Sequence, residues 1–89
     1  MTGKSYKIEV SKSAKKDLKS LPRKDLLKIA ILIEELANDP FPVGCKKLKG
    51  IDNLYRVRQG NYRILYTIEN KILTIVILKV GHRSKVYQF

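Results

Sequence analysis

The sequence predicts an α+β domain: an N-terminal strand, a helical hairpin, and then a three-stranded meander. Together these elements form a four-stranded, mostly antiparallel sheet with two helices packed on one face. Three observations predict this class. The apolar period changes from roughly 3.6 residues in the first half to 2 in the second. Gly60-Asn61 is a typical two-residue hairpin turn. No linker or repeat divides the 89 residues, so we expect residues 1–89 to form one domain.

The first half of the chain predicts one strand and two helices. Residues 6–10 alternate apolar and polar side chains, as a half-buried strand does. Ser11 or Ser13 can cap a short helix. Pro22 suits the first turn of a second helix, because its missing N–H costs nothing there. The apolar positions of the two helices are Ala14, Leu18 and Leu21, and then Leu26, Ile29, Ala30, Ile33, Leu36 and Ala37.

The second half predicts three strands at about 54–59, 62–69 and 72–80. The Gly60-Asn61 loop fixes the register of the first two, and a second turn at Asn70-Lys71 continues the meander. The helix-covered face then collects Tyr55, Val57, Tyr62, Ile64, Tyr66, Ile68, Leu73, Ile75 and Ile77. The opposite face collects Arg56, Arg58, Arg63, Leu65, Thr67, Thr74, Val76 and Leu78.

The last predicted strand is apolar on both faces, which is typical of a central strand. It therefore needs a neighbour on its far side. Residues 6–10 form the only unassigned strand, so we expect them to pair there and complete the four-stranded sheet.

The charge of the chain points to a polyanionic partner. Nineteen Lys and Arg against eight Asp and Glu give a formal net charge of +11, and nucleic acid is the commonest partner of such a domain. An acidic protein is a second expected partner. One cysteine, Cys45, and one histidine, His82, do not suffice for an ordinary metal site, so we expect no metal and no cofactor. No signal peptide or membrane-length apolar run is visible, which predicts a cytoplasmic protein without membrane contact.

Three arginines are expected to converge on the sheet face opposite the helices. Arg58 faces Arg63 directly, and Arg56 lies two residues from Arg58 on the same face. Like charges that oppose each other destabilise a sheet, and no acidic residue of these strands falls on that face to relieve the repulsion. Guanidinium groups bind phosphate oxygens with two parallel hydrogen bonds. The missing counter-charge is therefore expected to be a phosphodiester.

These residues also carry a resemblance to a known family. The run Leu54-Tyr55-Arg56-Val57-Arg58-Gln59-Gly60-Asn61-Tyr62-Arg63-Ile64-Leu65-Tyr66, followed by Gly81-His82-Arg83 and by Tyr87, resembles the RelE branch of the RelE/ParE toxin superfamily. The similarity extends over nearly the whole chain, because the opening strand, Leu21-Pro22, Asp39-Pro40 and Lys47-Leu48-Lys49-Gly50 also match in order and spacing.

The resemblance implies a toxin of a type II toxin–antitoxin system that acts as a metal-independent endoribonuclease. Such toxins enter the ribosomal A site and cut the messenger RNA, with the 2′-hydroxyl as nucleophile and a 2′,3′-cyclic phosphate as product. A cognate acidic antitoxin, RelB-like, inactivates them.

The resemblance also assigns roles to residues. Arg56 and Arg58 match two basic residues of the family's first arginine-bearing strand, and Arg63 matches its phosphate-binding arginine. Arg83 matches the later catalytic arginine, and Tyr87 the tyrosine that stacks on or orients the base. Beside the arginines we expect four lysines to bind RNA: Lys46, Lys47, Lys49 and Lys85.

Two departures from the family pattern affect these expectations. Some members carry lysines at the positions of Arg56 and Arg58, and a lysine can lose its proton whereas an arginine does not. Either catalysis rests on positioning the RNA and stabilising the charge that develops on the phosphate, or Lys47, Lys49 or His82 acts as the general base. The chain also stops at Phe89, so the C-terminal helix of some members is expected to be short or absent.

Two other functions are compatible with the sequence. One is a ParE-like inhibitor of DNA gyrase on the same fold, since one scaffold hosts several activities. The other is a non-enzymatic basic module that coats nucleic acid. The combination of Arg63, Arg83 and Tyr87 favours the ribonuclease.

Overall fold

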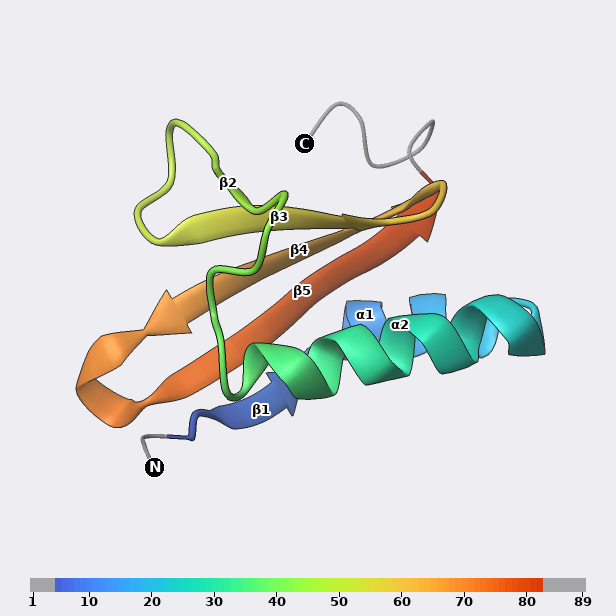
Figure 1. Cartoon of the computed structure of the whole chain (residues 1–89), viewed down its shortest axis with the longest axis horizontal. Helices are drawn as coiled ribbons and strands as arrows, with labels where there is room; N and C mark the ends of the chain where they lie inside the picture. The colour runs from blue at the N-terminus through green and yellow to red at the C-terminus, as the bar shows by residue number, and fades with distance from the viewer. Residues whose placement is uncertain (1–4, 83–89) are drawn as a thin grey trace.

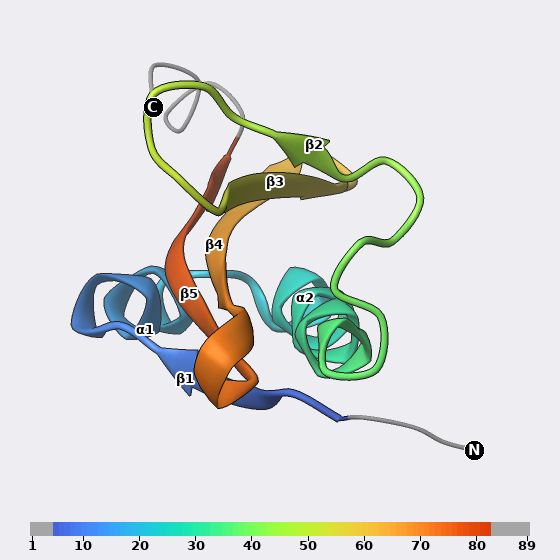
Figure 2. The ribbon, with the colours of Figure 1, turned by 90° about the vertical axis from the view of Figure 1, so that its left-hand side faces the viewer.

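A computed structural model describes residues 5–82 and shows two helices packed on one face of a mixed sheet (Figure 1). The elements are β1 (Lys7–Val10), α1 (Lys12–Lys19), α2 (Arg23–Leu36), β2 (Lys46–Lys47), β3 (Leu54–Gln59), β4 (Tyr62–Glu69), the 3-10 helix η1 (Asn70–Ile72) and β5 (Thr74–His82). In the described part of the chain the sheet has five strands in the order β1-β5-β4-β3-β2. Residues of both helices share one core with the sheet, and in the view turned by 90° β2 lies beside β3, at the edge of the sheet far from β1 (Figure 2). The predicted α+β class is therefore confirmed.

The predicted count of four strands is wrong, because the sequence pattern does not reveal β2. Its two residues, Lys46 and Lys47, are both exposed lysines, so they show neither alternation nor apolar character. The strand exists because it pairs with the outer edge of β3, where Lys46 lies opposite Arg56 and Lys47 opposite Tyr55.

The predicted register of the β3–β4 hairpin is confirmed at every pair. Gln59 lies opposite Tyr62, Arg58 opposite Arg63, and the pairing continues in step to the far end of the hairpin. Gly60 has a φ of +61°, a backbone conformation that is favourable for glycine. The predicted neighbour of the last strand is also confirmed, because β1 pairs with β5 in parallel. The turn thus fixes which side chains share each face of the sheet.

The start of β5 differs from the prediction. The sequence predicts a turn at Asn70-Lys71, but η1 extends to Ile72, and Leu73 follows in the left-handed region with a φ of +47°. The strand begins at Thr74, so the assignment of Leu73 to the apolar face is wrong. Thr74 is also buried, with its hydroxyl donating to the carbonyl of Ile72 at 3.0 Å. Local turn geometry outweighs the alternating pattern here.

A register shift between β4 and β5 changes the predicted alternation of inward and outward side chains in the second half of β5. Ile64 pairs with Val80, whereas Tyr66 pairs with Ile77, so β5 has one more residue than β4 in this stretch. Such a bulge changes which side chains share a face. Val80 consequently joins Ile75 and Ile77 in the core under the helices, while Leu78 packs on the opposite face.

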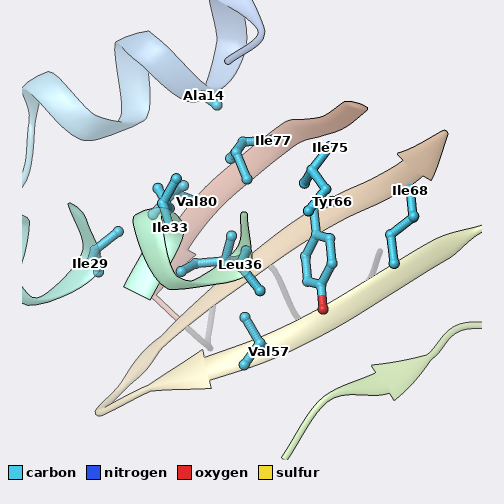
Figure 3. Close-up of a cluster of buried hydrophobic side chains, with 11 residues drawn as sticks. Ala14, Ile29, Ile33, Leu36, Val57, Tyr66, Ile68, Ile75, Ile77 and Val80 are labelled. Atoms are coloured by element: carbon cyan, nitrogen blue, oxygen red, sulfur yellow. The ribbon is translucent and has the colours of Figure 1, made fainter. Parts of the chain in front are cut away.

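The main core lies between the helices and the sheet (Figure 3). Its buried members are Ala14, Ile29, Ile33, Leu36, Val57, Ile64, Tyr66, Ile68, Ile75, Ile77 and Val80. The helical spacing of Ile29, Ile33 and Leu36 lays one side of α2 on the sheet. Ala30 was expected on that side but is exposed. The core therefore uses a narrower face of α2 than the sequence predicts.

Helix α1 takes the place of a strand beside the second half of β5. Because β1 pairs only with residues 74–77, the outer edge of β5 beyond Ile77 has no strand beside it in the described part of the chain. The hydroxyl of Ser11 caps α1 at Ala14 N and donates to the carbonyl of Leu78 at 3.0 Å. Asp17 accepts a hydrogen bond from the backbone N–H of Val80 at 3.0 Å and lies 3.6 Å from Lys79 Nζ. Polar side chains of the helix thus fix the C-terminal half of β5.

Tyr66 ties the segment after α2 to the centre of the sheet. Its hydroxyl donates to the carbonyl of Pro40 at 2.7 Å and lies 3.0 Å from Cys45 Sγ. Burial, followed by the contact with Cys45, raises the pKa of Tyr66, so the phenol stays protonated and donates. These contacts hold the chain that leads into β2.

We predict that Tyr66→Phe lowers the free energy of unfolding by about 1–2 kcal/mol, because it leaves the buried carbonyl of Pro40 without its donor. Urea unfolding measures this. Tyr6→Phe is the matched control, since the Tyr6 hydroxyl bonds to Asn70 at an exposed site, and its cost should stay within about 0.5 kcal/mol. Equal losses in the two variants would contradict the role assigned to Tyr66.

Candidate nucleic-acid interface

Four basic side chains share the sheet face opposite the helices. Arg58 of β3 lies directly opposite Arg63 of β4, and Arg56 lies two residues from Arg58. Lys46 of β2 joins them, because it pairs with Arg56 from the other side. Directly paired residues of neighbouring strands point to the same face. We call Lys46, Arg56, Arg58 and Arg63 the arginine face.

The charges on this face repel one another. Burial lowers the pKa of Arg56, and the positive charges of Arg63 and Arg58 lower it further. Arg56 nevertheless stays protonated near neutral pH, because a guanidinium does not lose its proton in proteins. Within residues 5–82, neither Arg56 nor Arg58 forms an ion pair with a carboxylate. The face therefore has the electrostatic character of an anion-binding surface.

The Nε atom of Arg56 is a buried donor with no hydrogen-bond partner among the described residues. Buried polar atoms are nearly always hydrogen-bonded in folded proteins, so each exception needs an explanation. A ligand with oxygen acceptors supplies one, and guanidinium groups suit phosphate oxygens particularly well.

A small apolar cluster lies beside the arginines on the same face. Leu54 and Leu65 are buried, and Leu48 and Leu78 pack against them. The backbone N–H of Leu48 also donates to the carbonyl of Leu54 at 2.9 Å. The cluster thus holds the basic loop after β2 against the sheet, next to Arg56.

The structure separates the lysines that the sequence grouped together. Lys46 shares a face with Arg56, whereas Lys47 pairs with Tyr55, a residue of the helix-covered face. Lys49 is exposed in the loop beyond β2. Of these three lysines, the strand pairing brings only Lys46 to the arginine face. This distinction was missed because β2 was not predicted.

His82 lies on the other face from the arginines. It pairs with Tyr62 at the end of β5, and the two rings meet edge to face with their centroids 5.8 Å apart. The hydroxyl of Tyr62 donates to Asp25 Oδ2 of α2 at 3.0 Å, and this hydrogen bond raises the pKa of Tyr62. Two hollows of about 340 and 280 Å³ flank this pair of rings. No sequence pattern predicts the Asp25–Tyr62 contact, because it joins residues far apart along the chain.

The remaining predicted site residues, Arg83, Lys85 and Tyr87, lie outside the described residues. Within residues 5–82, no three His, Cys, Asp or Glu side chains gather in a way that would hold a metal ion. In the same range no helix has both the length and the apolar character needed to cross a membrane.

Comparison with known proteins agrees with this architecture. Residues 8–87 match the family described as ParE toxin of type II toxin-antitoxin system, parDE. Toxin RelE3 of Methanocaldococcus jannaschii is 36% identical, with 93% of this chain and 97% of the relative covered. Toxin RelG of Mycobacterium tuberculosis is 31% identical, again with 93% of this chain and 97% of the relative covered. The crystal structure of the archaeal RelE-RelB complex from Pyrococcus horikoshii contains a chain with 31% identity and a TM-score of 0.80, covering 91% of this chain and 98% of that one.

We predict that Arg58→Gln raises the free energy of unfolding by about 0.5 kcal/mol at low ionic strength, because it removes the like charge opposite Arg63. The gain should shrink at high salt, which screens the repulsion. Urea unfolding at two salt concentrations measures both effects, with Lys71→Gln at the other end of the sheet as control. A loss of stability in Arg58→Gln would show that the pair is not strained.

Proposed function

The chain belongs to the RelE branch of the ParE toxin family of type II toxin–antitoxin systems, and from this premise we propose that it is an endoribonuclease. In this proposal it cuts messenger RNA in the ribosomal A site and needs no metal ion. The observation that carries the proposal is the arginine face, where Arg58 and Arg63 oppose each other with Arg56 beside them. A bound phosphodiester would neutralise this face and give the buried Nε of Arg56 an acceptor.

The proposed reaction is an attack of the RNA's 2′-oxygen on the adjacent phosphorus. The bond from phosphorus to the 5′-oxygen breaks, and the products are a 2′,3′-cyclic phosphate and a 5′-hydroxyl. Arg56 and Arg63 would bind the two non-bridging oxygens, on which negative charge develops in the transition state. Arg58 would hold the neighbouring phosphate and so align the strand. From the family resemblance, Arg83 is proposed as a further catalytic arginine and Tyr87 as the residue that orients the base.

Proton transfer is assigned to solvent in this proposal. The guanidinium groups cannot act as bases, and Lys46, the lysine that β2 brings beside Arg56, is assigned to phosphate binding. Lys47 and His82 pair with residues of the helix-covered face, and Lys49 lies in the loop beyond β2. Placement of the 2′-oxygen and neutralisation of the phosphate would therefore supply the rate enhancement. Lys46, Lys47, Lys49 and Lys85 would bind phosphates of the flanking nucleotides.

The proposed protein partner is an acidic antitoxin. The related toxin from Pyrococcus horikoshii was solved as a RelE-RelB complex, and the present chain carries a net charge of +11. An acidic segment laid over the arginine face would relieve the repulsion and exclude RNA at the same time.

Inhibition of DNA gyrase is the alternative, because the matching family description names ParE. Two measurements separate the activities. Mapping of messenger ends in a translating extract should show new, ribosome-dependent cuts within codons. Intact messenger together with loss of DNA supercoiling would instead support the gyrase inhibitor.

We predict that Arg63→Ala lowers the cleavage rate on programmed ribosomes by about a hundredfold or more, because the phosphate loses a charged donor in the transition state. The variant should remain folded, since Arg63 lies outside the main core. Lys71→Ala at the opposite end of the sheet is the matched control and should cut normally. Arg83→Ala tests the role that the resemblance assigns. Full activity of the folded Arg63→Ala protein would refute the assignment of this site.

We also predict that the single-turnover cleavage rate rises steadily with pH between about 6 and 8. Without a protein base, hydroxide must remove the 2′-proton, and its concentration grows over this range. A rate that levels off within this range, together with loss of the plateau in His82→Gln, would instead identify His82 as the base.

A further inference from the structure

A polar groove lies on the helix side of the β3–β4 turn, separate from the arginine face. It is formed between the N-terminal half of α2 and the tip of the hairpin, and it has a volume of about 340 Å³. The side chains that line it include Asp25, Lys28, Gln59, Asn61, Tyr62 and His82. We call this the hairpin groove. We propose that it binds one nucleobase of the RNA strand that occupies the arginine face, and so contributes to sequence preference. This inference rests on the proposed function.

The groove has the chemistry that reads a base. Gln59 and Asn61 offer amide groups that both donate and accept, and Asp25 offers a carboxylate. Single-stranded RNA is recognised by such groups on the edges of its unstacked bases, together with aromatic rings that contact their faces. The volume lies within the usual range of small-ligand pockets, roughly 300–1,000 Å³. A nucleobase therefore fits both the size and the polarity of the groove.

The aromatic wall of the groove is already fixed in place. Tyr62 is held at its hydroxyl by Asp25 Oδ2, at 3.0 Å, and at its ring by the edge-to-face contact with His82. A ring held from two sides loses little freedom when a base packs against it, and such preorganisation favours binding.

The groove lies one residue pair from the arginine face, on the other side of the sheet. Gln59 and Tyr62 form the pair nearest the turn, and Arg58 and Arg63 form the next pair, with their side chains on the opposite face. Successive pairs are only about 3.3 Å apart along a strand. An RNA strand with one phosphate on Arg63 and the neighbouring phosphate on Arg58 therefore reaches the groove after passing around Gly60 and Asn61. The base that enters belongs to a nucleotide next to the cut.

The carboxylate of Asp25 indicates which bases fit best. A carboxylate accepts hydrogen bonds and repels the carbonyl oxygens that also accept them. Cytosine, adenine and guanine carry an exocyclic amino group that donates, whereas uracil carries none. The groove should therefore disfavour uracil at the position that it reads.

The test uses messenger RNAs that differ in one base at successive positions around the cut, on programmed ribosomes. Wild-type protein should cut messengers with uracil at one flanking position about tenfold more slowly, which corresponds to one or two hydrogen bonds. A variant that combines Gln59→Ala with Asn61→Ala, and separately Asp25→Asn, should lose this discrimination at that position alone. Asn38→Ala, an exposed asparagine just beyond the other end of α2, is the matched control and should keep it. Circular dichroism checks that each variant is folded.

The outcomes separate the groove from the proposed function. Unchanged base preference at every position in the folded groove variants would overturn the groove assignment and leave the ribonuclease intact. If the wild-type protein does not cut, binding of short RNAs that carry one abasic nucleotide at successive positions gives the answer. If an abasic nucleotide at one position weakens binding to the wild type but not to the groove variants, the result supports base binding in the hairpin groove even though no cleavage is seen. Absence of RNA binding by the wild type would refute both proposals.

Discussion

The Gly60–Asn61 turn places Arg58 directly opposite Arg63, with Arg56 beside them, and this register is the constraint on which the rest of the structure depends. A two-residue turn leaves no freedom to shift the register, so the backbones of the two arginines stay opposite each other on the same face. Arg56, which is half-buried beside them, adds a third positive charge, and its partial burial and the charges of Arg63 and Arg58 lower its pKa. A protein that keeps such a face folded must gain its stability elsewhere, and here the gain comes from the opposite side of the sheet.

The helix-covered side supplies that stability and also fixes the geometry. Ile29, Ile33 and Leu36 pack on Val57 and the other apolar residues beneath the arginines. Helix α1 replaces a missing strand through Ser11 and Asp17, which hold the second half of β5. The same strands thus carry apolar side chains that bind the helices and basic side chains that repel one another. The arginine face is consequently built on the same strands that form the core behind it.

The parts of this structure that local patterns determine were predictable, and the parts that depend on distant contacts were not. The register of β3 and β4 follows from a recognisable turn, and with it the positions of Arg56, Arg58 and Arg63. The two lysines of β2 carry no periodic signal, and the strand forms only because β3 offers an open edge. Two further features depend on contacts between different helices and strands. They are the bulge that turns Val80 inward and the hydrogen bond between Tyr62 and Asp25. Sequence reasoning therefore located the arginine face but not the hairpin groove.

The order of strands in the sheet has a consequence for how the protein is made. β5 lies between β1 and β4, so the last strand of the sheet to be synthesised joins the first strand to the hairpin. While β5 is still missing, α1 lacks the strand on which it packs, and β1 has no neighbour to pair with. Contacts between residues so distant in sequence also form slowly. The sheet therefore cannot close until β5 has been synthesised, and until then β1 and the β3–β4 hairpin remain unjoined.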